Sequence, residues 1–206
     1  MTEKAPTIDT KSNDECYNNM HQAIKMHFKR MDEGTVQDFA LLAKVHTNGL
    51  KALPDLLINM LETLKSDAIY PIDRLAHSLQ TATRALKDNR DEEYVVCCLL
   101  HDFGESMGPF NHGEIAGAIL HPFISEGNQW MLAHHGIFQT YYFGDKLGID
   151  PNRRDQFKSS PYYEQTIEFC AKYDEVSFDP DYRSEPMSTF EPMVRKLLGS
   201  KTWSVM

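Results

Sequence analysis

Residues Asp73–Glu105, DRLAHSLQTATRALKDNRDEEYVVCCLLHDFGE, are the most informative stretch of this chain. The centre of the stretch, Tyr94–Leu100, is apolar on all sides, and a helix with that pattern lies in the interior of a domain. His101 and Asp102 follow it directly. Burying a charge costs several kcal/mol unless the group is paired or binds a metal. The stretch therefore predicts a buried helix that leads into two polar groups able to bind metal.

A His-Asp pair often arises by chance, so it needs support from the rest of the chain. Adjacent side chains on a helix diverge by about 100°, which lets His101 face one ion while the two oxygens of Asp102 bridge to a second. Further metal-competent residues lie at the ends of other predicted helices, beside apolar positions: His77, His112, the adjacent pair His134 and His135, and Asp174. Scattered surface residues would not fall so regularly, so the pattern favours one buried site. Nitrogen and oxygen ligands without thiolates suit iron, manganese or zinc.

The composition limits the partners. A chain of 206 residues suffices for one domain with a sizeable core. The net charge of −9 argues against nucleic acid and anionic lipid, because both need a positive protein surface. No apolar run approaches the roughly 20 residues that span a bilayer, and the N-terminus carries no secretory signal. We therefore expect neither a nucleic-acid nor a membrane partner; the composition does not indicate an oligomeric state.

The four cysteines point to a reducing compartment. Cys97 and Cys98 are adjacent inside the apolar run, while Cys16 and Cys170 lie far from it, and no CxxC spacing occurs. This pattern is typical of buried free thiols and not of a disulfide framework or a zinc ribbon. A cytoplasmic protein is predicted.

The periodicity predicts a disordered leader over 1–13 and a single all-α domain over 14–206, with N-terminal helices at 14–66 and a metal-binding core at 67–198. Thr35 suits an N-cap, Gly49 a helix break and Pro54 the first turn of a new helix. No strand-like alternation is present. The predicted helices cover about 13–31, 35–48, 54–64, 73–85, 91–103, 113–120, 125–134, 162–174 and 187–198.

At the polar positions named above, the chain resembles the HD-domain superfamily, an all-helical group with many phosphohydrolases. The resemblance covers roughly 69–198 and rests on one spaced series: His77, His101-Asp102, His112, His135 and Asp174. A smaller branch holds mixed-valent diiron oxygenases, including myo-inositol oxygenase and the phosphonate-cleaving oxygenases. The segment HSLQTA is similar to the opening of that branch's first ligand helix, and FCAKYDEVSFDPDYRSEPMSTFEPMVRKL is similar to the end of inositol oxygenase.

The resemblance implies a single HD-domain helical bundle that encloses a dinuclear metal site. Four histidines and two aspartates fit a complete diiron ligand set, so it implies two iron ions in the mixed-valent Fe2+/Fe3+ state, with Mn2+ or another divalent metal as the alternative. The implied activity is an oxygenase that uses O2 to cleave a C–C or C–P bond of a small hydroxylated substrate. The alternative is a phosphohydrolase that acts on a phosphate ester or nucleotide.

Three further residues are candidates for the site. The resemblance implies that Tyr70 caps the substrate-binding iron; otherwise it is an aromatic plug before Pro71. Glu105 is a candidate substrate-contacting group, or else a helix-end charge. His134 either orients a ligand or substrate, or faces solvent.

The resemblance also bears on the substrate. Glu105, Gln139 and Ala171 stand where related proteins carry basic or imidazole groups, which implies a pocket poorly suited to a dianionic phosphonate. Each lost charge-assisted hydrogen bond costs about 1.5–3 kcal/mol. A neutral substrate, or one with a positive group, is therefore expected in place of a simple aminophosphonate.

Overall fold

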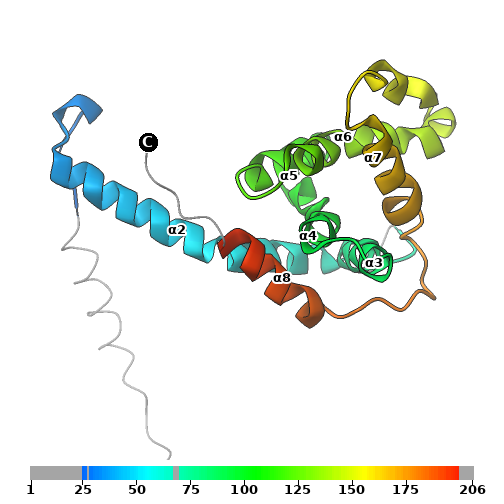
Figure 1. The fold of residues 1–206 in the computed structure, drawn as a ribbon, viewed down its shortest axis with the longest axis horizontal. Helices are drawn as coiled ribbons and strands as arrows, with labels where there is room; N and C mark the ends of the chain where they lie inside the picture. The colour runs from blue at the N-terminus through cyan, green and yellow to red at the C-terminus, as the bar shows by residue number, and fades with distance from the viewer. Residues whose placement is uncertain (1–24, 27, 67–69, 200–206) are drawn as a thin grey trace, which may run out of the picture. The chain divides into compact units, whose positions relative to one another are not determined.

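The computed structural model describes residues 25–26, 28–66 and 70–199, and Figure 1 shows their fold. The leader predicted over 1–13 and most of the first predicted helix lie outside these residues. Every regular element that the described residues form is helical, which confirms the all-α prediction for this part of the chain. In the same ranges, no helix is both long and apolar enough to cross a lipid bilayer.

The elements follow one another along the chain as short and long helices, where η marks a short 3-10 segment and η6 is one π-helical turn. They are η1 (Met31–Glu33), α2 (Val36–Thr63), η2 (Leu64–Ser66), α3 (Arg74–Lys87), α4 (Glu92–Leu100), η3 (Phe103–Ser106), α5 (His112–Leu120), α6 (Glu126–Phe143), η4 (Gly144–Leu147), η5 (Pro151–Phe157), α7 (Tyr163–Phe169), η6 (Cys170–Asp174) and α8 (Met187–Gly199). Contacts divide the chain into two compact units, one of 1–49 with 204–206 and one of 50–203. The second unit contains every residue of the predicted metal site.

Helix α2 begins where the sequence predicts but is longer than expected. The Thr35 hydroxyl accepts from the Asp38 backbone N–H at 3.2 Å, and the Asp38 carboxylate accepts from the Thr35 backbone N–H at 2.9 Å. The predictions of a break at Gly49 and a new start at Pro54 are wrong, because α2 runs through both. Pro54 is buried in the helix together with Leu57, and this packing offsets the backbone hydrogen bond that a proline inside a helix removes.

Replacing Gly49 with alanine is expected to stabilise α2 by about 0.5–1 kcal/mol, because alanine loses less conformational freedom in a helix interior. An added Cβ would have no atom within 4 Å outside the helix backbone. Thermal unfolding followed by circular dichroism measures the effect. A clear loss of stability would show that Gly49 interrupts the helix after all.

Three other predicted boundaries are corrected. The described residues between 25 and 30 form no helix, so the first predicted helix does not reach Met31. Helix α4 ends at Leu100, before the predicted end at residue 103, because the backbone of Asp102 leaves the helical region with φ −107° and ψ 2°. Helix α6 continues past His134 to Phe143, since Phe138 extends its buried face.

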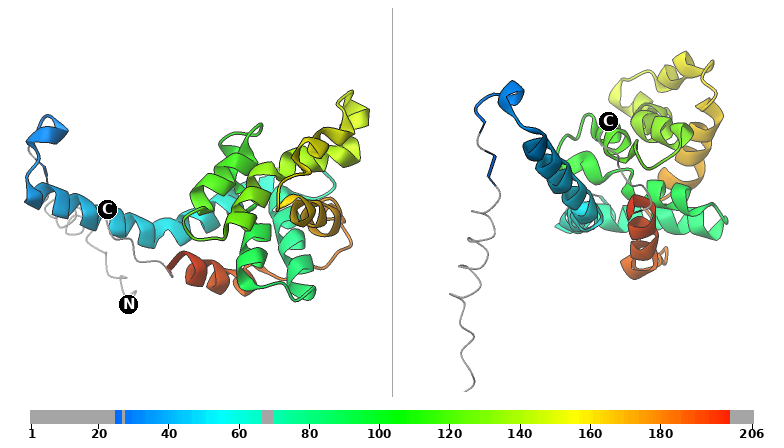
Figure 2. Two further views of the ribbon diagram at one scale, coloured as in Figure 1. Left: turned by 45° about the horizontal axis from the view of Figure 1, so that its top comes forward. Right: turned by 60° about the vertical axis from the view of Figure 1, so that its left-hand side comes forward.

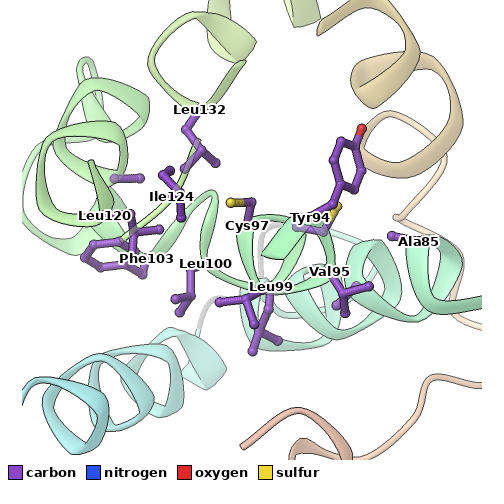
Figure 3. Packing of buried hydrophobic residues seen from close by; sticks show 14 of the residues in the cluster. Ala85, Tyr94, Val95, Cys97, Leu99, Leu100, Phe103, Leu120, Ile124 and Leu132 are labelled. Carbon is purple, nitrogen blue, oxygen red and sulfur yellow. The ribbon is translucent and has the colours of Figure 1, made fainter. Parts of the chain in front are cut away.

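The core of the second unit surrounds α4. Asp91 caps this helix by accepting from the Tyr94 backbone N–H at 2.8 Å, and all seven residues of Tyr94–Leu100 are buried. Figure 3 shows Cys97 on one side of α4 and Leu99 on the other. Helices α3, α6 and α8 contact α4, and α6 also packs along α5 and α7 (Figure 2). A helix that is apolar all round is therefore covered all round, as predicted.

Candidate metal centre

Five separate elements deliver the six predicted ligand residues to one place. His77 projects from α3, and His101 and Asp102 follow the end of α4. The remaining three come from the start of α5, the interior of α6 and the π-helical turn η6: His112, His135 and Asp174. His112 is partly buried and the other five are buried.

Asp102 lies at the centre of the cluster and faces two sets of imidazoles. Its Oδ2 lies 3.5 Å from His77 Nε2 and 3.3 Å from His101 Nε2. Its Oδ1 lies 3.2 Å from His112 Nε2 and 3.3 Å from His135 Nε2. Each carboxylate oxygen thus serves a different pair of histidines.

Asp174 belongs to the first of these sets. Its Oδ1 lies 3.2 Å from His77 Nε2 and 3.6 Å from His101 Nε2. The π-helical turn places it there, because the Glu175 backbone N–H bonds to the Cys170 carbonyl at 2.9 Å, five residues back. An inserted π-turn rotates the residues after it, and such turns occur frequently at functional sites.

Backbone carbonyls determine which ring nitrogens face the cluster. In each histidine Nδ1 donates to a carbonyl, namely Ser177 for His77 (2.8 Å), Cys98 for His101 (2.8 Å), Pro109 for His112 (2.9 Å) and Leu132 for His135 (2.7 Å). In a neutral imidazole this arrangement leaves Nε2 as a lone pair. Two Nε2–Nε2 distances, His77–His101 and His112–His135, are 3.1 Å. Lone pairs this close repel unless a proton or a metal ion lies between them.

The pKa shifts of the cluster also indicate that it favours positive charge. Burial lowers the pKa of His101, but the carboxylates of Asp102 and Asp174 outweigh it and raise this pKa to about 10. The pKa of His112 is also raised, because hydrogen bonding and charge attraction from Asp102 outweigh burial. Burial would raise the pKa of both aspartates, yet the neighbouring imidazoles hold each below its usual range. Without metal, protons on His101 and His112 balance the negative charges of these carboxylates.

The metal-free protein should therefore be stabilised most by this cluster between about pH 4 and about pH 6.5. The raised pKa of His101 contributes stability below its ordinary value of 6.5, which is lost as the pH rises through about 10. The lowered pKa of Asp174 contributes above its ordinary value of 3.8, and this is lost at lower pH. Metal must displace the imidazole protons, so Mn2+ should raise the unfolding temperature more at about pH 8 than at about pH 6. Equal shifts at both pH values would contradict this competition.

These buried groups could hold a metal ion. In two sets, His77 with His101 and Asp174, and His101 with Asp102 and His135, the ligand atoms lie within 4.8 Å of one another. The donors are nitrogen and oxygen, which fits the predicted preference for iron, manganese or zinc. The described cysteines are free and buried, and burial raises the pKa of each thiol: Cys97, Cys98 and Cys170.

A cavity of about 650 Å³ opens onto the cluster, with Tyr70 in its wall. The Tyr70 ring lies 5.7 Å from that of Phe178, which stacks on the His77 ring at 4.4 Å. Tyr70 is 45% exposed. Tyr70 therefore lines the cavity directly and is separated from the His77 ring by Phe178, and its role as a metal cap stays a prediction.

Glu105 also lines this cavity, where it forms an ion pair with Arg74, a residue that the sequence reasoning missed. Arg74 is buried, and its Nη2 donates to Asp102 Oδ2 at 2.9 Å. The available signal was its position three residues before His77, because residues at this spacing share one face of a helix.

The structure does not bring His134 into the cluster. Its Nδ1 donates to the Trp130 carbonyl at 2.8 Å, and its ring stacks on the Trp130 ring at 3.9 Å. Gln139 lines the cavity, whereas Ala171 lines a different depression. The expected substrate without an anionic group assumed a pocket that lacks basic side chains. Arg74 lines this cavity and is such a side chain.

All six residues that carry the resemblance to the HD-domain superfamily thus lie in one cluster beside one cavity. The membership itself stays an expectation, because neither a family model nor a curated protein matches this chain.

Proposed function

We propose that this chain is an HD-type metalloenzyme with two metal ions bridged by Asp102. One ion would bind His77, His101 and Asp174, and the other would bind the remaining pair of histidines, His112 and His135. One observation carries the proposal: the two oxygens of Asp102 face two separate sets of Nε2 atoms, at 3.2–3.5 Å. With a single metal ion, a proton would have to separate the other pair of Nε2 atoms.

The favoured reaction is that of a diiron oxygenase, in which O2 serves to cleave a C–C or C–P bond of a small hydroxylated substrate. When bound, two irons would polarise a substrate oxygen and supply electrons to O2. The chain's own residues orient the substrate and exclude water. Phe178 and Phe143 line the cavity with apolar surface, and backbone carbonyls hold the ligand imidazoles in one orientation.

A metal-dependent phosphohydrolase is the second candidate. The observation that favours it is Arg74, because a guanidinium in a cavity beside divalent ions suits a phosphate ester. In that reaction Tyr70 would have no part at the metal.

Metal content and low-temperature EPR separate the two candidates. The chain is purified with and without oxygen from cells supplied with iron. A diiron oxygenase should contain nearly two irons per chain and give a mixed-valent signal that changes when a substrate is added. Activity on phosphate esters with Mn2+, together with no mixed-valent signal, would favour the hydrolase and overturn the oxygenase.

Replacing Tyr70 with phenylalanine provides a second check on the oxygenase. If Tyr70 caps an iron, the variant should keep its iron but show a changed EPR spectrum and a changed rate of reaction with O2. Its ring should still contact Phe178, so stability should be nearly unchanged. An unaltered spectrum and turnover would mean that Tyr70 only packs.

A further inference from the structure

Arg74 and Glu105 form an ion pair in the wall of the cavity, next to Asp102. Arg74 is the first residue of α3 and is only 7% exposed, while Glu105 lies in η3, three residues after Asp102. The guanidinium contacts both Glu105 and Asp102. It therefore joins the first ligand helix to the turn that carries the bridging carboxylate.

Besides Glu105 Oε2, which forms an ion pair with Arg74, two buried side-chain atoms of residues that line this cavity have no hydrogen-bond partner among the described residues. One is Nε of Arg74, a donor, and the other is Oε1 of Gln139, an acceptor. Both residues line the cavity. A buried polar atom without a partner costs about 1–3 kcal/mol, so a ligand that satisfies both atoms would gain that energy.

The charges of the cavity favour an anion once metal is bound. Among the described lining residues, Arg74 carries the only lysine or arginine charge, against four carboxylates: Asp102, Glu105, Asp174 and Glu175. The carboxylates of Asp102 and Asp174 would bind the proposed ions. The four positive charges of two divalent ions exceed the two negative charges of these carboxylates. Arg74 then loses part of its hold on Asp102 and keeps Glu105 as its partner. The guanidinium becomes available to a ligand oxygen.

We propose that Arg74, positioned by Glu105, determines specificity by binding an anionic oxygen of the substrate, while Gln139 accepts a hydrogen bond from the substrate hydroxyl. The substrate class is a small hydroxylated compound with a carboxylate or phosphonate group. This inference rests on the proposed metal site, and it replaces the expectation of a substrate without an anionic group.

Isothermal titration calorimetry on the metal-loaded full chain tests the assignment without an activity assay. The probes are glycolate and hydroxymethylphosphonate, which identify the preferred oxyanion, and ethylene glycol as the uncharged control. Arg74→Gln should weaken binding of the anionic probe about tenfold to a hundredfold, with ethylene glycol unaffected. Arg153→Gln is the matched control, because Arg153 is exposed and outside the cavity lining. Glu105→Gln keeps a side-chain oxygen that can position the guanidinium but removes the negative charge that competes with the anion, so it should tighten anion binding.

The outcomes are distinct. The assignment is overturned if Arg74→Gln, at equal metal content, binds the anionic probes with wild-type affinity. It is also overturned if the metal-loaded wild type binds ethylene glycol more tightly than the anionic probes. If Arg74→Gln loses its metal, Glu105→Gln decides, because it leaves Arg74 in place: anion binding that is not tightened overturns the assignment. A wild-type chain without metal ends the proposed function, and this inference with it.

Discussion

Replacing Asp102 with alanine is expected to abolish metal binding and to lower the stability of the metal-free protein. The carboxylate is in contact with four imidazoles, two on each oxygen, and with the guanidinium of Arg74. Removing one partner of a buried charged network costs about 3–5 kcal/mol, because the opposite charges remain buried. Metal analysis per chain and thermal unfolding measure the two effects.

Two further variants test whether the loss of the Asp102 charge causes these two effects. Asp102→Asn keeps the shape and removes the charge, so it should lose metal while retaining more stability than the alanine variant. Asp145→Ala is the control, because Asp145 is an exposed aspartate in η4 and should change neither quantity. An Asp102→Ala protein with full metal content would end the assignment of Asp102 as the bridge.

Replacing Gly113 with alanine is expected to destabilise the fold and to weaken metal binding together. An added Cβ would lie 2.6 Å from the Leu132 carbonyl oxygen and 3.0 Å from the ring atoms Cε1 and Nδ1 of His135. That same carbonyl accepts the Nδ1–H of His135 at 2.7 Å. The methyl group would push on both His135 and its acceptor. Overpacking of this kind costs about 1–3 kcal/mol.

Gly136→Ala is the matched control for this prediction. Gly136 also lies in a helix of the site, but an added Cβ would have no atom within 4 Å outside the helix backbone. Alanine should keep or raise stability there. If the Gly113 variant unfolds at the same temperature as wild type and retains its metal, α5 and α6 are less closely packed than the distances indicate.

Helix starts could be predicted because caps are local. Asp73 accepts from the backbone N–H of Ala76 at 2.7 Å, and Ser125 accepts from that of Asn128 at 3.4 Å. In each case donor and acceptor lie three residues apart, so a short sequence contains the whole interaction. Helix breaks were less predictable: Gly49 and Pro54 favour a break locally, but α2 continues through both.

The choice between the two adjacent histidines of α6 illustrates a different limit. His134 and His135 differ by about 100° around the helix, so only one can face Asp102. His134 stacks on Trp130, whereas His135 reaches Asp102. The apolar pattern around them could not assign the faces, because helices pack on several sides of α6. The resemblance favours His135 over His134, and His135 is the one that lies beside Asp102.

By itself, the sequence was enough to predict the helical class of the described residues, the burial of α4 and the polar residues that gather beside it. Local periodicity and the cost of burying charge carry that information. Only the tertiary structure decided that Arg74 contacts Asp102, 28 residues away, and that the histidines divide into two sets. Such pairings depend on how separate helices pack, and the free energy that selects them is spread over the whole core.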